Sequence, residues 1–568
     1  MTGAAQPTPR WKLRRAFAHQ ERLPNLPPVV GTVLAARGIT TREAAERFYK
    51  PHLEGRHNPL LLPGMESALR RTRDAIDARE PIALFGDFDV DGVTSIALLK
   101  LALERLGAVT IPYLPDRFRE GYGLNVGAVD ELREAGAGLL ISADCGTSSV
   151  AEVAHANSLG MDAIVLDHHT VPSELPAALA VINPKREGSP YPFTELAAVG
   201  VSYRFLQALY ESLGRELPER DFLDLVALGT VVDVAPLEDE NRAIVASGLG
   251  FMRESPRPGV EALASIAGTS ADRIRSETLG FGLGPRLNAA GRMKHARTAL
   301  DLLLAQTPLA ARQIAEELDV LNRQRQAECE QGLLEAEALL GASDDPLTMV
   351  GSERMHAGII GIIAGRLVEA RSRPAIVYEQ GPETSRASAR TFGDFDIVKA
   401  IRKEADLLVR HGGHRAAAGF TIWNEHLDLF KDRIVNTAAE QLAPEDLRPS
   451  VTIDAEASLG DLSGVEIRGL TQFEPCGHGN RRPVLLSRNV ELRDARQVGS
   501  DGSHLKLKVR EGASTWPGIA FRMGEAELAD EIDIVYSLSR EWRGDRMELE
   551  VLDFAPSAEA RPLDRLGG

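Results

Sequence analysis

The chain has 568 residues, which is too long for a single hydrophobic core and predicts three or four domains. Hydrophobic residues make up 43% of it, but no window approaches the roughly 18 uninterrupted apolar residues that a membrane-spanning helix needs. The 65 Lys and Arg against 82 Asp and Glu give a net charge of −17, which argues against nucleic acid as a partner unless basic residues gather locally.

The first 75 residues are predicted to form a basic leader followed by short helices, one of them in TTREAAERFYK. The leader is positively charged but has no apolar core behind it, so we do not expect a secretory signal. The three cysteines, Cys145, Cys329 and Cys476, are far apart and form no CxxC pair. They favour a reducing, cytoplasmic setting.

Between residues 80 and 175, short apolar runs alternate with helical periods. The runs PIALF, VTIPYL, AGLLISA and DAIVLD are typical of strands buried on both faces, and SIALLKLALERLG and VGAVDELREAG are typical of crossover helices. This alternation predicts a parallel α/β sheet. Residues 195–260 are predicted to be mostly helical.

The stretch 309–341 contains no proline and is predicted to be one long helix that joins two lobes; two packed helices broken near Gly332 are the alternative. A second α/β unit follows at about 346–440, with strands in LTMVGS and PAIVYE and a helix in IIGIIAGRLVEA. From 450 to 558 the short alternating strands indicate a small barrel or sandwich of OB type.

These patterns divide the chain into six segments. They are the leader with short helices (1–75), a parallel-sheet domain (76–305), the connecting helix (306–342), a smaller α/β domain (343–445), a β domain of OB type (446–558) and a C-terminal tail (559–568).

Acidic and imidazole side chains follow the predicted parallel strands, where each strand ends. FGDFDVDG places Asp87, Asp89 and Asp91 after the strand PIALF, Asp144 follows AGLLISA, and Asp167, His168 and His169 follow DAIVL. Asp233 ends another apolar run. Ligands bind beyond the carboxyl ends of the strands in an open parallel sheet, so we expect one site there. Alone, a DxD is often an N-cap or a turn, and a His-His pair is usually surface.

So many carboxylates would repel one another and become protonated unless cations lie between them. A pair of divalent ions removes the repulsion and can hydrolyse a phosphate ester. Carboxylates with one or two imidazoles suit Mn²⁺ or Mg²⁺ better than Zn²⁺. Asp167 is interpreted as lying behind the ligands, where it orients an imidazole.

The motifs DFDVDG, ADCGT, LDHH and GTVVDVAPL, in this order, resemble the four motifs of the DHH phosphoesterases. DRFREGYGL, GPRLNAAGRM, HAGIIGIIAGRL, HGGHRAAAGF and FEPCGHGN are similar to motifs of the RecJ branch, and the likeness covers roughly residues 45–555. The resemblance implies a DHH domain, a DHH-associated domain and an OB-type domain. It also implies cleavage of single-stranded DNA from the 5′ end with Mn²⁺ or Mg²⁺, in recombination and repair.

Carried over by position, the resemblance makes six residues metal ligands: Asp87, Asp89, Asp91, Asp144, His168 and Asp233. It places His169 beside the scissile phosphate, as a donor to it or to the leaving oxygen. It leaves open which acid bridges the two ions. The chain departs from the family pattern at Thr391, where serine is common, and in GHGNRRP, which has two arginines.

Substrate contacts are expected in motifs rich in arginine and glycine, which we interpret as loops. HGGHRAAAG is interpreted as a turn that opens a helix and cradles a phosphate with Gly412, Gly413 and His414; a close-packing glycine pair is the alternative. Ser388 and Arg390 are candidates for a terminal phosphate. Further candidates are Arg117, Arg286, Asn288 and His356, although any of these arginines could instead form a surface ion pair. Of Phe473, Trp516 and Phe521, we expect two in a core and one as a stacking platform.

The leading hypothesis is a metal-dependent 5′→3′ exonuclease on single-stranded DNA, with its polarity taken from the resemblance. One alternative is a DHH phosphoesterase for short oligonucleotides or nucleotide phosphates. Another is a catalytically inactive replication scaffold. The resemblance also suggests a monomer that cooperates with a helicase and a single-strand binding protein.

Overall fold

The structure is a computed structural model, and it describes residues 9–14, 23, 26–51, 57–499, 501–540, 546–559 and 561–565. Much of the predicted basic leader and the last residues of the predicted tail lie outside these ranges. Within the described ranges, no helix is long and apolar enough to cross a membrane.

The chain forms two compact units. The first combines 1–51 with 448–476 and 480–568, and the second combines 52–447 with the short segment 477–479. Each unit is described by itself below. The second contains both predicted α/β lobes, so the two lobes can be discussed together.

The first lobe is built on a parallel sheet with the strand order β3-β2-β4-β5-β6. The strands β2, β4 and β5 are buried and apolar, as expected from their uninterrupted hydrophobic sequences, and the predicted parallel sheet is confirmed. The expected burial on both faces was wrong for β3, where Val109 is exposed and the other residues are half-buried, because β3 lies at the edge of the sheet. The fifth strand, Ala180–Ile182, has only three residues and was not predicted. The bounds are β2 Pro81–Gly86, β3 Val109–Tyr113, β4 Leu139–Ala143, β5 Asp162–Leu166 and β6 Ala180–Ile182.

Helices cover both faces of this sheet. Leu84 and Ile141 pack with α4 and α7 on one face, and Phe85 and Leu140 pack with α5 and α6 on the other. The strand order reverses direction between β2 and β4, which is where doubly wound sheets bind ligands. The bounds are α3 Met65–Ala78, α4 Val90–Arg105, α5 Val126–Glu134, α6 Val150–Ser158 and α7 Ala198–Ser212.

A helical layer completes the first lobe. GPRLNAAGRM, interpreted from sequence as a loop, forms the helix α11; the loop interpretation was wrong because Pro285 lies at the helix start, where its missing N–H costs nothing. The bounds are α8 Leu223–Val232, α9 Asp239–Glu254, α10 Pro258–Ile266, the π-helix η5 Thr278–Leu283, α11 Gly284–Met293 and α12 Arg297–Leu304.

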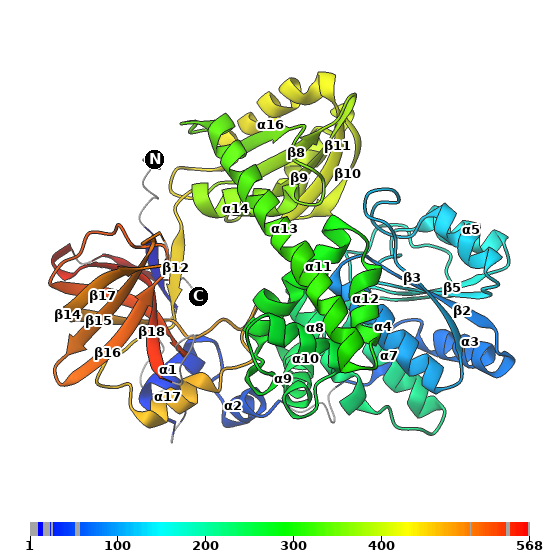
Figure 1. Cartoon of the computed structure of the whole chain (residues 1–568), viewed down its shortest axis with the longest axis horizontal. Coiled ribbons are helices and arrows are strands. Elements are labelled where there is room, and N and C mark those ends of the chain that lie inside the picture. The colour runs from blue at the N-terminus through cyan, green and yellow to red at the C-terminus, as the bar shows by residue number, and fades with distance from the viewer. Residues whose placement is uncertain are drawn as a thin grey trace. The chain divides into compact units, whose positions relative to one another are not determined.

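One helix connects the two lobes, as predicted. The helix α13, Pro308–Leu340, has 33 residues, and Thr307 caps it by accepting a hydrogen bond from the Ala310 N–H. It runs from the helices of the first lobe to the sheet of the second (Figure 1). Gly332 does not break it: a Cβ there would lie 2.5 Å from the side chain of Ile363, so the glycine allows close packing.

The second lobe has a mixed sheet with the strand order β10-β11-β9-β8-β7. Two loop interpretations were wrong here. SRASAR lies in β9, and HGGHRAAAG forms the hairpin of β10 and β11, in which Gly413 pairs with Ala418, rather than a turn that opens a helix. The bounds are β7 Thr348–Ser352, α14 Ile360–Arg371, β8 Ala375–Gln380, β9 Thr384–Arg390, α15 Ile397–Lys403, β10 Leu408–His414, β11 Ala417–Trp423 and α16 Leu427–Gln441.

The other unit contains a closed five-stranded barrel, because β14 pairs with both β15 and β17. Phe473 is in its core, Trp516 packs against that core, and Phe521 is 53% exposed. A small sheet, β12-β1-β19, joins segments from both ends of the chain. The bounds are β1 Arg10–Leu13, α1 Pro28–Ala36, α2 Arg42–Tyr49, β12 Ser450–Ile453, β13 Ala455–Glu456, α17 Gly464–Thr471, β14 Leu485–Val498, β15 His504–Glu511, β16 Ser514–Ala520, β17 Glu531–Arg540, β18 Met547–Pro556 and β19 Leu563–Arg565.

Candidate metal centre and phosphate cleft

The three acids of FGDFDVDG lie on the turn from β2 to α4. Asp87 follows the strand directly, and Asp89 is the N-cap of α4: its Oδ1 accepts hydrogen bonds from the N–H groups of Asp91 (3.0 Å) and Gly92 (3.2 Å). A Cβ on Gly92 would lie 2.4 Å from the carbonyl oxygen of Asp87. The tight turn therefore requires glycine, and the N-cap interpretation of this DxD holds alongside any role in binding.

Asp144 and Asp233 reach the same edge from strained backbone. Asp144 follows β4 with a φ of 65°, and Val234, directly after Asp233, has a φ of 64°. The left-handed region is costly for a β-branched residue such as valine, and such strain persists only where the surroundings impose it. Asp233 itself is the C-cap of α8.

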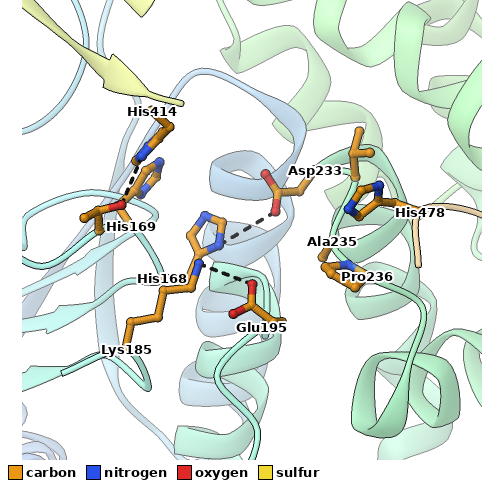
Figure 2. A pocket seen from close by; sticks show the side chains of 11 residues that line it. His168, His169, Lys185, Glu195, Asp233, Ala235, Pro236, His414 and His478 are labelled. Carbon is orange, nitrogen blue, oxygen red and sulfur yellow. Dashed lines mark hydrogen bonds and ion pairs between the residues drawn. The ribbon is translucent and has the colours of Figure 1, made fainter. Parts of the chain in front are cut away.

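The structure brings the predicted acids and imidazoles together. His168 Nε2 lies 3.3 Å from Asp144 Oδ1 and 3.8 Å from Asp91 Oδ2, and His168 Nδ1 lies 3.8 Å from Asp233 Oδ2 (Figure 2). The potential ligand atoms form three groups, each within 4.8 Å: Asp144, His168 and His169; Asp91, His168 and Asp233; Asp87, Asp89 and Asp144.

Burial makes this edge unfavourable for carboxylates without a cation. Burial first, and then repulsion between neighbouring acids, raises the pKa of Asp91 to about 7 and those of Asp87 and Asp144 well above the ordinary range. Burial likewise lowers the pKa of His168 to about 3, so its imidazole is neutral, as a metal ligand must be. Asp87 Oδ1 and His168 Nε2 are buried and have no hydrogen-bond partner within the described part of the chain. These residues fit divalent cations.

Asp91 has a second role. Its two carboxylate oxygens accept hydrogen bonds from the backbone N–H groups of Ala198 (2.7 Å) and Val199 (2.9 Å), at the start of α7. The N-cap position of that helix, Ala197, has no side chain that could do this. Asp91 therefore caps α7 and fixes the start of this helix beside the metal edge.

Asp167 holds His169. Its Oδ1 accepts hydrogen bonds from the Nδ1–H of His169 (2.7 Å) and from the N–H groups of both histidines, and its Oδ2 accepts one from the Thr147 N–H. Burial opposes the charged form of Asp167, but these bonds outweigh it and lower its pKa. Burial alone would lower the pKa of His169, but the hydrogen bond to Asp167 and the charges of the nearby acids outweigh it, and the pKa is raised.

A cavity of about 320 Å³ opens from the metal edge. His168, His169 and Asp233 line it together with Lys185, which is 3.7 Å from Glu195, and His414, whose Nδ1 is 3.0 Å from the Thr170 hydroxyl (Figure 2). The ring of His414 stacks on that of His169, with 5.7 Å between centroids. The second lobe thus reaches the metal edge through the tip of the β10–β11 hairpin.

Arginines gather on another side of the metal edge. Arg117 lies over the ring of Phe88, 4.3 Å from its centroid, and it is within electrostatic reach of Asp87. Arg390 donates to Ser388 Oγ (3.1 Å), and Arg292 donates to the Gly358 carbonyl (3.2 Å). Within the described ranges, none of these three arginines has a carboxylate at ion-pair distance, which is expected of a site for an anion.

Other predicted substrate residues lie elsewhere or have protein partners. Arg286 forms an ion pair with Asp319 (2.9 Å), and the Nε2 of His356 is 2.5 Å from Glu328. Asn288 is half-buried on α11. Gly412 is exposed on β10 and Gly413 faces Ala418 across the hairpin, so their N–H groups do not form a phosphate cradle at a helix start.

Four residues of the site were missed from the sequence: Arg292, Tyr122, Lys185 and His478. Arg292 and Tyr122 stand in the motifs GPRLNAAGRM and DRFREGYGL, which identified these segments but not these two side chains. The Tyr122 hydroxyl donates to the Asp144 carbonyl (3.2 Å) and lies 3.2 Å from His169 Nε2. His478 and Lys185 line the cavity; His478 stands in the motif FEPCGHGN and Lys185 in the basic stretch PKR, but neither side chain was chosen as a site residue.

Comparison with known families assigns all three folded parts. The DHH family, N-terminal domain, matches residues 81–230, the DHHA1 domain matches 344–440, and the RecJ OB domain matches 453–553. A parallel sheet with acids and a His-His pair at its edge, followed by a DHHA1 domain, defines a DHH-type protein.

Curated relatives narrow the class. The chain is 36% identical over 574 residues to the single-stranded-DNA-specific exonuclease RecJ of Escherichia coli, and the alignment covers 95% of this chain and 98% of that protein. It is 34% identical to RecJ of Bacillus subtilis, with 98% of this chain and 72% of the relative covered. The chain belongs to the RecJ family of single-stranded-DNA-specific exonucleases.

Solved structures agree with this assignment. The crystal structure of Thermus thermophilus RecJ in complex with Mn²⁺ superimposes with a TM-score of 0.84 at 28% identity, over 98% of this chain and 80% of that one. A complex of the same protein with Mg²⁺ matches with a TM-score of 0.78. The family predicted from the motifs is thereby confirmed, as is the order of parallel-sheet, α/β and barrel domains.

Proposed function

We propose that this chain is a metal-dependent exonuclease that hydrolyses single-stranded DNA from its 5′ end, in DNA recombination and repair. The observation that carries the proposal is the convergence of buried carboxylates and imidazoles into three groups of ligand atoms, each within 4.8 Å. RecJ relatives are named single-stranded-DNA-specific exonucleases, and two structures of the Thermus thermophilus protein are complexes with Mn²⁺ or Mg²⁺.

Six side chains would hold two Mn²⁺ or Mg²⁺ ions in this proposal: Asp87, Asp89, Asp91, Asp144, His168 and Asp233. Bound divalent cations neutralise phosphate charge and lower the pKa of water. The acids are buried, so they stay ionised only when cations are bound beside them. The cations, and the reaction that they support, are therefore confined to the sheet edge.

His169 acts on the substrate directly. Asp167 accepts the hydrogen bond from Nδ1–H, so the Nε2 of the ring, 3.2 Å from the Tyr122 hydroxyl, is left for the substrate. The raised pKa of His169 keeps a second proton on the ring at a pH where a free imidazole would lose it. We assign this proton to a hydrogen bond with the scissile phosphate or the leaving oxygen, and we assign Asp167 to holding the ring in place.

Polarity comes from the arginines next to the metal edge. Arg117, Arg292 and Arg390, with Ser388, form an anion site in which, among the described residues, no carboxylate lies at ion-pair distance. Arg117 and Arg292 are within electrostatic reach of Asp89 at the metal edge. A terminal 5′-phosphate held there would place a nearby phosphodiester bond at the metal edge. The cavity lined by Lys185 and His414 then takes the strand on the other side of the cut.

The test is digestion of single strands labelled at the 5′ or the 3′ end, in Mn²⁺, Mg²⁺ or EDTA. We expect early release of the 5′ label, stepwise shortening of 3′-labelled strands, and no cleavage in EDTA. Asp144→Asn is the matched inactive control. Shortening from the 3′ end contradicts the polarity. Activity confined to dinucleotides favours a small-substrate phosphoesterase, and binding without cleavage favours a scaffold.

Three further statements belong to this proposal. The enzyme acts as a monomer, it works in the cytoplasm, where its three cysteines stay reduced, and it cooperates with a helicase and a single-strand binding protein that supply single strands. Light scattering of the purified protein tests the first. Stimulation of cleavage on duplex ends by a helicase tests the last.

A further inference from the structure

The connecting helix changes character where it passes from one lobe to the other. Its buried residues up to Leu318 belong to the core of the first lobe, and those from Cys329 onwards belong to a core of the second. Between them, Asn322 is 2% exposed and Arg325 is 9% exposed. A polar pair is therefore buried at the junction of the lobes, where an apolar pair would complete either core.

Arg325 is not satisfied by the protein. Its Nη2 donates to Asn322 Oδ1 (2.9 Å), while its buried Nε has no partner in the described part of the chain. There, no carboxylate lies at ion-pair distance from Arg325 or from Arg366 on α14. A buried guanidinium without counter-charge is costly, so the site is built for an anion that the protein does not supply.

Arg292 is within electrostatic reach of three other arginines. Burial, and then the charges of Arg117, Arg325 and Arg390, lower the pKa of Arg292 to about 9. Burial and Arg366 lower the pKa of Arg325. Arg325 therefore links the buried Arg292, which is also within reach of Arg117 and Arg390, to Arg366 on α14.

The charges exceed what one terminal phosphate can balance. A phosphomonoester carries about two negative charges near neutral pH, fewer than the positive charges of the arginines Arg117, Arg292, Arg325, Arg366 and Arg390 together. Each further phosphate on the same end adds negative charge. Space is present on the α14 side: a Cβ on Gly361 would be 3.0 Å from Arg390 Nη2, whereas one on Gly365 would meet nothing within 4 Å.

We propose that Arg292, Arg325 and Arg366 form a second anion subsite behind the terminal-phosphate site, which takes the outer phosphates of a polyphosphorylated 5′ end. The inference rests on the proposed function, because it assumes that Arg117 and Arg390 hold the first phosphate. The ligand chemistry is a chain of phosphates, carried either by a 5′-triphosphorylated strand or by a free nucleoside triphosphate.

The experiment compares three single-stranded oligonucleotides with a 5′-hydroxyl, 5′-monophosphate or 5′-triphosphate end and a fluorescent label at the 3′ end. Their affinities for the full chain are measured by anisotropy in EDTA, so that no cleavage occurs. We expect the triphosphate end to bind about tenfold more tightly than the monophosphate end, because further charge-assisted hydrogen bonds form. Arg325→Gln should remove that difference and keep the preference for monophosphate over hydroxyl.

Arg323→Gln is the matched control, since Arg323 is on the same helix but is exposed and pairs with Asp319. Arg366→Gln tests the same subsite if Arg325→Gln unfolds. Competition with unlabelled ATP separates the sources: displacement that depends on Arg325 but with no gain for the triphosphate strand assigns the subsite to a free nucleotide.

Two results would overturn the inference. One is a triphosphate strand that binds no better than the monophosphate strand together with no Arg325-dependent ATP competition. The other is a gain that Arg325→Gln and Arg366→Gln leave unchanged. A failure of the proposed function looks different: Arg390→Gln would then leave the monophosphate preference intact, or wild-type protein with Mn²⁺ would not cleave the strand.

Discussion

Replacing Asp89 with asparagine separates its two roles. The substitution removes one negative charge from the metal edge but keeps a side-chain oxygen that can accept the hydrogen bonds now donated by the N–H groups of Asp91 and Gly92. Asparagine and aspartate are about equally good N-caps, whereas alanine loses the cap and about 1 kcal/mol of stability. Asp89→Asn therefore tests charge, and Asp89→Ala tests charge and cap together.

The size of the charge effect follows from the geometry. Ligand oxygens of Asp87, Asp89 and Asp144 lie within 4.8 Å of one another. Two unit charges about 5 Å apart repel by roughly 3 kcal/mol at an effective dielectric constant near 20. The raised pKa values of Asp87 and Asp144, and the charges of Arg117 and His169, offset part of this repulsion, so without metal we expect Asp89→Asn to stabilise the fold by about 1–2 kcal/mol. With Mn²⁺ at about 100 times its Kd, the wild type gains roughly 2.7 kcal/mol that the variant largely lacks.

The assay is thermal unfolding of the three proteins in EDTA and across a Mn²⁺ titration. In EDTA, Asp89→Asn should melt above the wild type, and Asp89→Ala should melt below Asp89→Asn. Saturating Mn²⁺ should reverse the order of wild type and Asp89→Asn. Equal stabilisation of both by Mn²⁺, or a lower melting temperature of Asp89→Asn in EDTA, would refute the reasoning that Asp89 belongs to a set of mutually repelling metal ligands.

Three other predictions concern positioning, binding and packing. Asp167→Asn should lower kcat about 10–100-fold while strand affinity in EDTA stays within about twofold, because it misorients His169 without touching the cleft. Arg292→Gln should reduce the slope of log affinity against log salt by about 0.7, and an unchanged slope would remove it from phosphate contact. Gly92→Ala should destabilise the chain by about 2 kcal/mol in denaturant unfolding, since its Cβ would lie 2.4 Å from the Asp87 carbonyl; a neutral effect would show that the turn can relax.

The local pattern of the sequence was enough to predict the sheet and its acidic edge. Strands buried on both faces are continuous apolar runs, and the carboxyl ends of parallel strands must meet at one edge. Asp87, Asp144 and His168 could therefore be placed together from positions far apart in the chain. The long connecting helix was predictable for a similar reason, because uninterrupted helix-forming residues need no distant partner.

Which side chains line the cleft depends on which side of each helix or strand faces inward. Arg286 and Arg292 lie six residues apart on α11, about 240° around the helix, so at most one faces the cleft. Packing against α13 paired Arg286 with Asp319 and left Arg292 for the anion site. Motifs rich in arginine predicted the region, but the sequence analysis chose Arg286 and missed Arg292.

Pairing between strands far apart in the sequence decided the structure of the segments that carry Ser388, Arg390 and His414. HGGHRAAAG became a hairpin because β11 pairs with β9 along its whole length, and that partner is about thirty residues earlier in the chain. The same pairing carries His414 to His169 and orients Ser388 and Arg390. The sequence by itself determined the fold class, the family and the acids at the sheet edge, because these depend on periodicity and strand order. Only the tertiary structure decided which cationic side chains face that edge. The rotation of a helix and the partner of a strand are set by contacts between segments far apart in the chain.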